Sequence, residues 1–400
     1  MTKGVGGSTA EQELARLSDR TRDIAPIAAA EYEQRMDRAR ALMREAGLGA
    51  IYLHAGTSLY YFTGMRWWAS ERMVAAVLPA EGDLHYIAPA FEEDTLRSFM
   101  VMPGELHCWD EHESPYELLA GVLERCAPKG ALGIDEATPF FTFDGLRRAR
   151  PDLELVAAER VTRGCRAQKS ATELALMQRA KDMTLEVHQA AARILYPGIE
   201  TTEVVEFIDA AHRALGAPAG SSFCIVLFGT DSAFPHGVRS PKPLAENDVV
   251  LIDTGCLVQG YNSDITRTYV FGDPNARQRE VWEVEHRAQA AAFEAAQLGV
   301  PCRAVDAAAR AEIERSGFGP GYSLPGLPHR TGHGIGLDIH EGPYLVGSDD
   351  TPLAEGMCFS NEPMICVPGE FGIRLEDHFY MTSDGPRWFT QPSPSIDEPL

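Results

Sequence analysis

Four acidic residues and one histidine in the C-terminal part of the chain are the types of side chain from which a divalent-metal centre is built. Each lies in an apolar, strand-like or glycine-rich stretch, which predicts a buried position. Buried carboxylates repel one another, and their pKa values rise unless cations neutralise them. Two divalent ions would balance four carboxylates. The five residues and their contexts are Asp253 in VVLIDTG, Asp264 in YNSDITRTY, His333 in HRTGHGIGLDIH, Glu362 in SNEPM and Glu376 in GIRLEDHFY.

The ligand types narrow the choice of metal. An oxygen-rich set with one imidazole suits Mn, Co, Zn or Fe(II) better than a structural zinc site, which takes Cys and His. We expect two divalent ions per chain, with Mn(II) first and Zn or Co next. The eight cysteines include no CxxC pair, which argues against a cysteine-based zinc site.

The spacing of the two aspartates predicts a hairpin. Asp253 and Asp264 lie 11 residues apart, and either Gly255 or Gly260 could turn the chain between them. Paired strands would place both carboxylates side by side on one face, because side chains alternate along a strand. Taken singly, either aspartate is better explained as the cap of a turn. As a pair within two β-rich segments they favour a metal site.

Three histidines within twelve residues mark a second part of the site. His329, His333 and His340 share the stretch HRTGHGIGLDIH, whose glycines allow the backbone to approach a ligand. A single histidine would more often be a core or surface residue, but this cluster favours a site. His236 adds a further imidazole in the turn-rich segment FGTDSAFPHG.

The two glutamates lie near strand-like segments that close the chain. Glu362 precedes Pro363, which favours extended backbone at the glutamate. Arg374 stands two residues before Glu376 and therefore faces the same side of a strand. The simpler alternative for this arginine is a surface ion pair of at most about 1 kcal/mol.

Apolar periodicity predicts two regimes of secondary structure. Strands alternate with helices up to about Cys165, which indicates an α/β domain. A second regime begins there with a long helix, for which Ser170 and Glu173 form a capping box. Residues 1–8 and the C-terminal PSPSIDEPL are expected to be irregular, the former disordered. The predicted helices are 9–47, 115–127, 170–195, 202–216, 276–297 and 303–316, and the predicted strands are 50–54, 73–79, 84–88, 131–135, 222–228, 248–253, 261–271, 357–367 and 372–382.

Composition excludes several classes of partner. The 400 residues include 36 basic and 58 acidic side chains, a net charge of −22, which argues against nucleic acid or an anionic membrane as a partner. The sequence shows neither an apolar run of the roughly 18–20 residues that span a bilayer nor a secretory h-region. We therefore expect a cytoplasmic protein with reduced cysteines. For Trp67 and Trp68 we favour packing inside the N-terminal domain over a pocket or subunit contact.

Jointly, these motifs resemble the pita-bread metallopeptidases: prolidases, aminopeptidase P, methionine aminopeptidase and their inactive or diverted relatives. The family pattern is DxG, then SDxTRT, HxxxHGIG, a Glu before Pro and an RxED-like strand, and the match covers about residues 165–385. The preceding segment is similar to the creatinase-type N-terminal domain, which methionine aminopeptidase lacks. The complete ligand set argues against creatinase and against relatives that have lost their metals.

The resemblance implies a fold and a reaction. We expect an α/β (α+β) protein with a creatinase-type N-terminal α/β domain over residues 1–164 and a C-terminal pita-bread catalytic domain over residues 165–400. The resemblance further implies that two metal ions, held by the five residues named first, bridge a water and generate hydroxide, which attacks the carbonyl before proline.

The resemblance also implies roles for the remaining site residues. Glu362 would accept and shuttle a proton, and His236 and His340 would hydrogen-bond the substrate and its oxyanion. His329 would support His333 or its loop, and Arg374 would orient Glu376 and the end of the substrate. The expected substrate is an Xaa-Pro dipeptide, and a homodimer is expected by analogy.

Two positions depart from the family pattern and leave alternatives open. Many relatives carry Tyr where this chain has Cys366, and prolidases often carry an Arg for the substrate carboxylate where it has Tyr344. Aminopeptidase P, which cuts longer peptides with proline second, is therefore the nearest alternative. A lyase or non-peptidic amidohydrolase on the same scaffold is a second, and a metal-dependent binding module a third.

Overall fold

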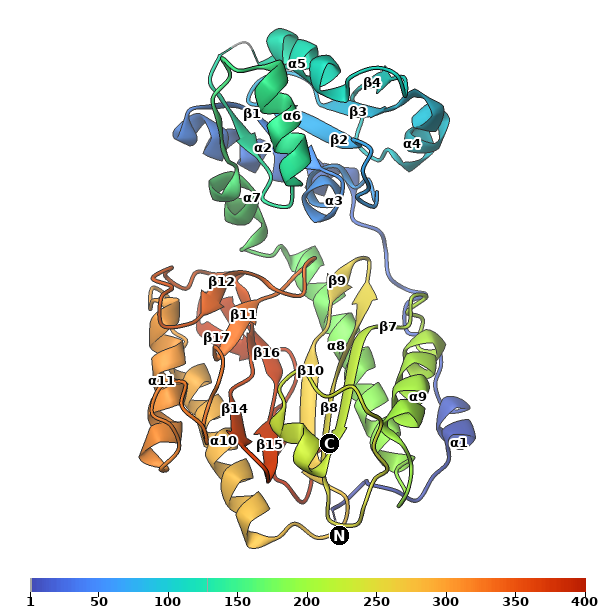
Figure 1. Ribbon diagram of the computed structural model, residues 1–400, viewed down its shortest axis with the longest axis vertical. Coiled ribbons are helices and arrows are strands. Elements are labelled where there is room, and N and C mark those ends of the chain that lie inside the picture. Colours follow the sequence, from blue (N-terminus) through green and yellow to red (C-terminus); the bar gives the residue numbers. More distant parts are fainter. Residues whose placement is uncertain (1, 128) are drawn as a thin grey trace. The chain divides into compact units, whose positions relative to one another are not determined.

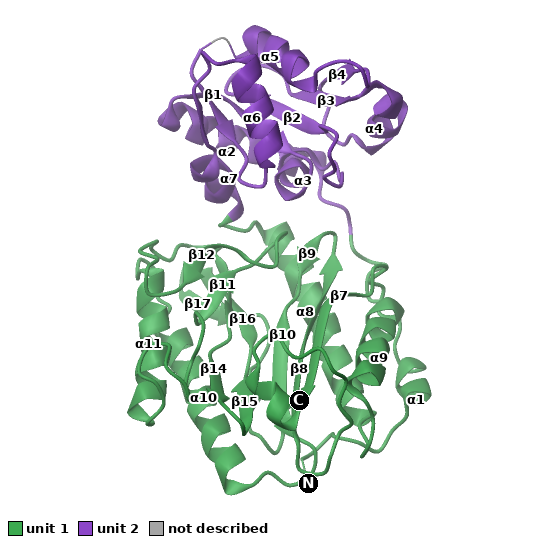
Figure 2. Cartoon of the chain, in the orientation of Figure 1, with its two compact units in different colours: residues 1–24, 167–400 green, residues 25–166 purple. Residues whose placement is uncertain are grey.

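The chain folds into two compact units. The computed structural model describes residues 2–127 and 129–400. One unit comprises residues 25–166, and the other joins residues 1–24 to residues 167–400 (Figure 2). No helix of the described residues combines the length and apolar character that a membrane crossing requires.

The first 24 residues belong to the C-terminal unit, whereas the predicted ranges of 1–164 and 165–400 placed them in the N-terminal one. Helix α1 (Ala10–Leu14) contacts α8 (Ala171–Arg193) and α9 (Thr201–Ala214). The Glu13 side chain is fully buried and pairs with Arg193. The expected helix over 9–47 is therefore wrong in its first half, because a long irregular stretch separates α1 from α2 (Ala29–Ala46).

The expected disorder of residues 1–8 is wrong for residues 2–8. Backbone amides of Thr2 and Gly6 donate hydrogen bonds of 2.9 Å to the carbonyls of Gly272 and Ala192. Met1 lies outside the described residues.

The unit of residues 25–166 is a six-stranded sheet in the order β4-β3-β2-β1-β5-β6. The pairs β1–β5, β5–β6 and β3–β4 are parallel, and β2 runs antiparallel to both of its neighbours. Four of these strands were predicted, whereas β4 and β6, which are largely only partly buried, were missed. The strands are β1 (Leu48–His54), β2 (Ala75–Pro79), β3 (His85–Pro89), β4 (Glu105–Trp109), β5 (Ala131–Ile134) and β6 (Leu155–Ala157).

Helices cover both faces of this sheet. The apolar core includes Tyr52 and Val77 of the strands together with Leu123 of α5 and Leu146 of α6. Helices α2 and α3 contact β1, and α7 packs on α2. Trp68 is 90% exposed, so the expected internal packing is wrong for this residue. The remaining helices of the unit are α3 (Thr57–Thr63), the 3-10 turn η1 (Ala90–Glu92), α4 (Glu93–Phe99), α5 (Pro115–Cys126), α6 (Phe140–Ala149) and α7 (Glu159–Arg166).

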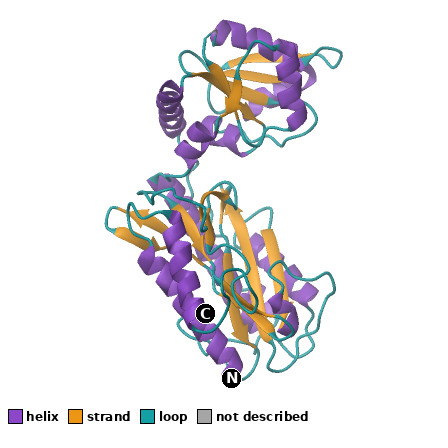
Figure 3. Cartoon of the chain, turned by 60° about the vertical axis from the view of Figure 1, so that its left-hand side comes forward, coloured by secondary structure: helices purple, strands orange, loops and turns teal. Residues whose placement is uncertain are grey.

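In the C-terminal unit the order of two helices followed by strands occurs twice, as the sequence suggested. Helices α8 and α9 contact β8 and β7, and α10 and α11 contact strands of the second half. Figures 1 and 3 show the helices outside the strands. The long helix α8 begins with the predicted capping box of Ser170 and Glu173. Helices α10 and α11 span Ala276–Ala295 and Cys302–Arg315.

The strands of this unit form three sheets. One has the order β10-β8-β7 with β9 paired to β8, the second has the order β12-β11-β13-β16-β17, and β14 pairs with β15. These elements confirm the predicted α/β (α+β) class. The strands are β7 (Ser221–Phe228), β8 (Val249–Val258), β9 (Tyr261–Asn262), β10 (Ile265–Val270), β11 (Gly332–Gly334), β12 (Glu341–Leu345), β13 (Cys358–Asn361), β14 (Met364–Val367), β15 (Phe371–Arg374), β16 (Asp377–Thr382) and β17 (Gly385–Trp388).

Candidate metal centre

Asp253 and Asp264 meet across the antiparallel pair of β8 and β10. Asp253 lies within β8 opposite Thr266, and Asp264 immediately precedes β10. Each of the two carboxyl groups influences the pKa of the other. The turn lies at Gly260, which has a φ of 87°.

Gly255, the other candidate for the turn, instead lies within β8. A Cβ there would approach the Ser263 carbonyl oxygen to 1.9 Å. The glycine therefore allows the backbone around Ser263 to pack closely against β8.

His333 and Glu362 are brought together by β11 and the end of β13. The His333 Nε2 lies 3.1 Å from Glu362 Oε1 and 3.6 Å from Asp264 Oδ2. The Ser360 hydroxyl accepts a 2.9 Å hydrogen bond from the His333 amide and donates a 3.1 Å bond to Glu362. The His333 Nδ1 lies 3.0 Å from the Gly334 carbonyl oxygen. A proton on Nδ1 satisfies that bond and leaves Nε2 free to bind a metal.

Glu376 completes the cluster from the segment between β15 and β16. Its Oε2 accepts a 2.8 Å hydrogen bond from the Thr266 hydroxyl. Arg374 donates a 3.0 Å bond from Nε to the same hydroxyl and forms an ion pair with Asp253. The arginine that was expected to orient Glu376 therefore reaches it only through Thr266, and its direct partner is Asp253.

The cluster holds more negative than positive side chains. Burial raises the pKa of Asp253, Asp264 and Glu376, and repulsion from the other carboxylates raises it further. Glu362 differs: burial alone would raise its pKa, but neighbouring positive charge, including that of Arg374, lowers it below its ordinary value. Arg374 balances only part of the negative charge.

These residues fit divalent cations. Two ligands on a tetrahedral ion with bonds of about 2.0 Å lie roughly 3.3 Å apart, and the distances around His333 Nε2 bracket that value. The Asp253 Oδ1 is buried and has no hydrogen-bond partner among the described residues. Overlapping triplets of ligand atoms, Asp264–Glu376–His378 and His333–Glu362–Glu376, each fall within 4.8 Å. The arrangement can therefore hold cations and place them against a water and a carbonyl group.

The other predicted histidines lie at the edge of the cluster. The His340 ring is 4.2 Å from the ring of His333, centroid to centroid. His329 Nδ1 lies 2.7 Å from the Arg330 carbonyl oxygen, and its buried Nε2 has no partner among the described residues. His236 lines a pocket of about 330 Å³ together with Ile225, which pairs with Asp253 across β7 and β8.

Two buried residues of the cluster were missed by sequence reasoning. His378, on β16, lies with its Nε2 3.2 Å from Glu376 Oε1. Its position two residues after Glu376 could have indicated a shared strand face. Lys181 of α8 is fully buried, and its Nζ donates a 3.2 Å bond to the Asn262 carbonyl. Burial lowers its pKa to about 8, although Asp264 and Glu376 oppose that shift. Nothing in the helical pattern indicated that Lys181 would lie near the predicted metal ligands.

The two positions that depart from the family pattern have defined surroundings. Cys366 is buried on β14, and its amide and carbonyl bond to Gly326. Tyr344 lies opposite His333 on β12, and the Arg330 guanidinium lies over its ring at 4.4 Å. Arg330, in the segment before β11, therefore places a positive charge beside Tyr344.

Comparison with protein-family models gives two matches. The model of metallopeptidase family M24 matches residues 175–383, and that of the creatinase/prolidase N-terminal domain matches residues 35–168. The expected creatinase-type and pita-bread domains are confirmed by these matches. All five predicted ligands lie within the first matched range.

Individual relatives align along nearly the whole chain. An Xaa-Pro dipeptidase of Pyrococcus horikoshii is 30% identical, over 87% of this chain and 94% of the relative. Among solved structures, dipeptidase PepE from Mycobacterium ulcerans is 34% identical with a TM-score of 0.85, covering 92% of this chain and 97% of that one. A prolidase from Thermococcus sibiricus is 29% identical with a TM-score of 0.81, covering 91% and 98%.

Proposed function

Because the chain belongs to metallopeptidase family M24, a family that uses divalent metal ions, we propose that it hydrolyses Xaa-Pro dipeptides with two such ions. The observation that carries the proposal is the convergence of the five predicted ligands on one largely buried cluster. These ligands are Asp253, Asp264, His333, Glu362 and Glu376. The names of the aligned Xaa-Pro dipeptidase and prolidase supply the substrate class.

The donor chemistry supports manganese as the first choice of metal. Carboxylate oxygens suit Mn(II), and one imidazole also admits Zn or Co. When bound, such ions lower the pKa of a water molecule towards neutrality and polarise a carbonyl group. The protein must then bind and orient the dipeptide and move protons.

Glu362 is the proposed proton acceptor and shuttle. Burial would raise the pKa of Glu362, but neighbouring positive charge, including that of Arg374, lowers it below its ordinary value, so the carboxylate is available as a base at neutral pH. The Ser360 hydroxyl fixes the orientation of Glu362 by donating to Oε1. A carboxylate that faces the ligand shell and is held by one hydroxyl can take a proton from water and pass it to the leaving proline nitrogen.

The histidines around the cluster are proposed to bind the substrate. His340 lies against His333 and can donate to the oxyanion that develops on the scissile carbonyl. His236 borders the pocket beside β7, where it can contact the substrate. The buried His329 Nε2, which has no hydrogen-bond partner within residues 2–127 and 129–400, lies near Glu362, which supports a role in fixing the loop and its neighbours.

Arg374 is proposed as a positioning residue. It pairs with Asp253 and donates to Thr266, whose hydroxyl holds Glu376. One guanidinium therefore sets the orientation of two proposed ligands, one directly and one through a hydroxyl group.

A substrate panel tests the function. Purified protein loaded with Mn, Co or Zn should release proline from Met-Pro and Ala-Pro. Much faster turnover of Xaa-Pro-Pro or longer peptides would identify an aminopeptidase P instead. Turnover of no proline peptide with any of the three metals would favour the lyase or amidohydrolase alternative, for which the Cys366 departure leaves room.

We further propose that the protein is a cytoplasmic homodimer. All eight cysteines are free thiols, which supports a reducing compartment. Trp68, Phe91 and Phe99 of the N-terminal unit are 90%, 60% and 50% exposed, which supports a subunit contact. Light scattering of the purified protein would test the dimer.

A further inference from the structure

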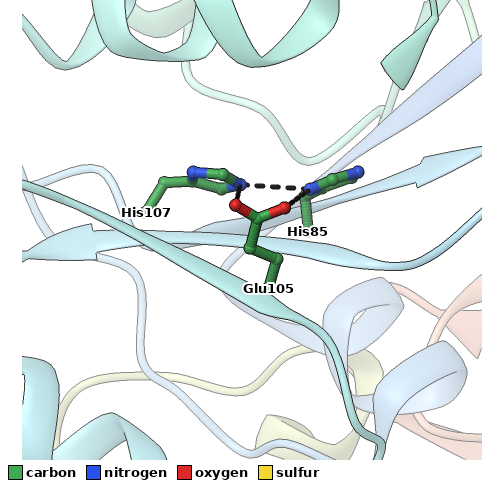
Figure 4. A group of neighbouring side chains, drawn as sticks. All are labelled: His85, Glu105 and His107. Atoms are coloured by element: carbon green, nitrogen blue, oxygen red, sulfur yellow. Dashed lines mark hydrogen bonds and ion pairs between the residues drawn. The ribbon is translucent and has the colours of Figure 1, made fainter. Parts of the chain in front are cut away.

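Two histidines and a glutamate form a separate cluster on the sheet of the N-terminal unit. His85 begins β3, and Glu105 and His107 lie on the neighbouring parallel strand β4. The register pairs His85 with Glu105 and Ile87 with His107. Glu105 and His107 are two residues apart and therefore project from the same face of β4. The side chain of His85 reaches across to both (Figure 4).

The three side chains direct nitrogen and oxygen atoms at a common point. His85 Nδ1 lies 3.1 Å from His107 Nε2. Glu105 divides its two oxygens between the rings, with Oε2 3.5 Å from His85 Nδ1 and Oε1 3.8 Å from His107 Nε2. Figure 4 shows the carboxylate beneath the facing edges of the two imidazoles.

These separations are those of ligands on one small cation. A tetrahedral zinc ion with bonds of about 2.0–2.1 Å holds its ligand atoms roughly 3.3–3.4 Å apart. The observed 3.1, 3.5 and 3.8 Å therefore need only small side-chain rotations. Two imidazoles and one carboxylate are also a donor set that zinc uses, with water in the fourth position.

We propose that His85, Glu105 and His107 form a zinc site in the N-terminal unit, separate from the metal centre formed by Asp264 and His333. A hydrogen bond between the two imidazoles alone is the simpler alternative. It explains the contact at 3.1 Å, but it leaves unexplained why a carboxylate with a 66% exposed side chain turns back over both ring nitrogens.

The charges around the cluster favour a dication. Besides Glu105, the carboxylate of Asp83 acts on His85, and Arg125 of α5 acts on both imidazoles with the opposite sign. The net charge of these side chains is negative with neutral imidazoles. Burial lowers the pKa of both histidines, so the neutral form that binds metals prevails at neutral pH.

A zinc ion at this place would secure the edge of the sheet. Strand β4 is the terminal strand of the order β4-β3-β2-β1-β5-β6, and its side chains are only partly buried until Trp109. The ion would cross-link β4 to β3 through side chains, in addition to the backbone ladder. Its expected role is structural, because it would bind the folded sheet and not the unfolded chain.

Zinc counting on the full chain tests the proposal. After EDTA treatment and reloading with micromolar ZnCl₂, Glu105→Gln and His107→Gln should each retain one zinc ion fewer than the parent protein. The same difference of one ion is expected in a His333→Ala background, so the result does not depend on the proposed peptidase centre. The dissociation constant of this ion should rise at least about tenfold in Glu105→Gln. Equal zinc content in the parent protein and both variants would overturn the proposal.

Two further measurements guard against misfolding and adventitious binding. The side chain of Glu105 is largely exposed, so Glu105→Gln should fold even if His107→Gln does not. Zinc should slow amide hydrogen exchange along β4 in the parent protein but not in Glu105→Gln. Glu154→Gln, a change of an exposed glutamate in the same unit, is the matched control and should keep its zinc. Loss of zinc from this control as well, or no effect of zinc on β4, would show that binding is non-specific.

Discussion

His333 and Glu362 face each other with 3.1 Å between Nε2 and Oε1, and both are held by the same hydroxyl group of Ser360. The ligand nitrogen and the proposed base are therefore positioned by one side chain. Substitution of the histidine should remove a metal ligand, whereas substitution of the glutamate should remove the proton acceptor as well as a ligand.

The change His333→Ala should abolish metal retention and activity together. The imidazole Nε2 is the only nitrogen among the five proposed ligands, and its loss leaves the carboxylates with less to hold a cation. Metal content by atomic emission and proline release from Met-Pro would be measured side by side. His286→Ala is the control, since His286 stacks on Trp282 at 5.1 Å and lies on α10. Full activity in a metal-free His333→Ala protein would contradict the assignment.

The change Glu362→Gln should reduce kcat by at least about two orders of magnitude, as expected when a general base is removed. Glutamine keeps the size of the side chain and can still accept the hydrogen bond from Ser360. Stopped assays of proline release would measure the loss, and Glu355→Gln, an exposed glutamate on the preceding loop, should behave as the parent protein. A rate near that of the parent would exclude Glu362 as the base.

The change Cys366→Ser should leave kcat/KM within about twofold of the parent value. Burial raises the pKa of the Cys366 thiol to about 11, so the group remains protonated and weakly nucleophilic at neutral pH. The comparison of Ala-Pro hydrolysis by the two proteins is the measurement. A collapse of the rate in a folded Cys366→Ser protein would show that the thiol takes part in the reaction.

The change Arg330→Met should raise KM for Xaa-Pro about tenfold, with little effect on kcat. The Arg330 guanidinium lies over Tyr344, and its charge acts on His340, so it can pair with a free substrate carboxylate. A charge-assisted bond of this kind contributes about 1.5–3 kcal/mol. KM for Ala-Pro amide should change less than KM for Ala-Pro. Arg303→Met, at an exposed ion pair with Asp350, is the control, and equal changes for acid and amide would refute this role.

The stability of the C-terminal unit should fall as the pH drops from about 6.5 towards about 4. Burial lowers the pKa of His212 from 6.5 to about 4, and its ring contacts the hydroxyls of Thr184 and Ser221. The unfolded chain binds a proton first, so this histidine supports folding above its unfolded pKa and loses that contribution on acidification. The shift corresponds to a loss on the order of 3 kcal/mol.

Urea unfolding at pH 7.5, 6 and 5 checks this expectation, with His212→Gln as the comparison. The variant should be less stable than the parent at pH 7.5, and the difference should shrink at pH 5. A difference that stays constant with pH would mean that His212 does not carry the effect.

The ligand set could be predicted because each member lies in a short local pattern. The hairpin of Asp253 and Asp264 followed from the 11-residue spacing and alternation of side chains. The capping box at Ser170 likewise follows from three neighbouring positions. Such patterns involve residues close together in the chain, so they can be recognised in a single sequence.

The supports of the ligands could not be predicted because they depend on contacts between distant segments. The pair of Arg374 with Asp253 spans 121 residues, and the bond from Thr266 to Glu376 spans 110. Lys181 enters the cluster from a helix whose pattern only predicts that one face is buried. The position of residues 2–24 on the C-terminal unit also could not be predicted from the sequence, since it depends on a tertiary ion pair of Glu13 with Arg193.

That last feature bears on how the protein is made. The polypeptide leaves the C-terminal unit after Ile24 and returns to it at Ala167. In the order of the sequence, the N-terminal unit is therefore an insertion within the C-terminal unit. During synthesis the inserted unit can complete its own sheet as soon as residue 166 has emerged from the ribosome. Residues 2–24 can pack on the C-terminal unit only after α8 has been synthesised. Until then the Glu13 carboxylate stays in water, because its partner Arg193 lies at the end of that helix.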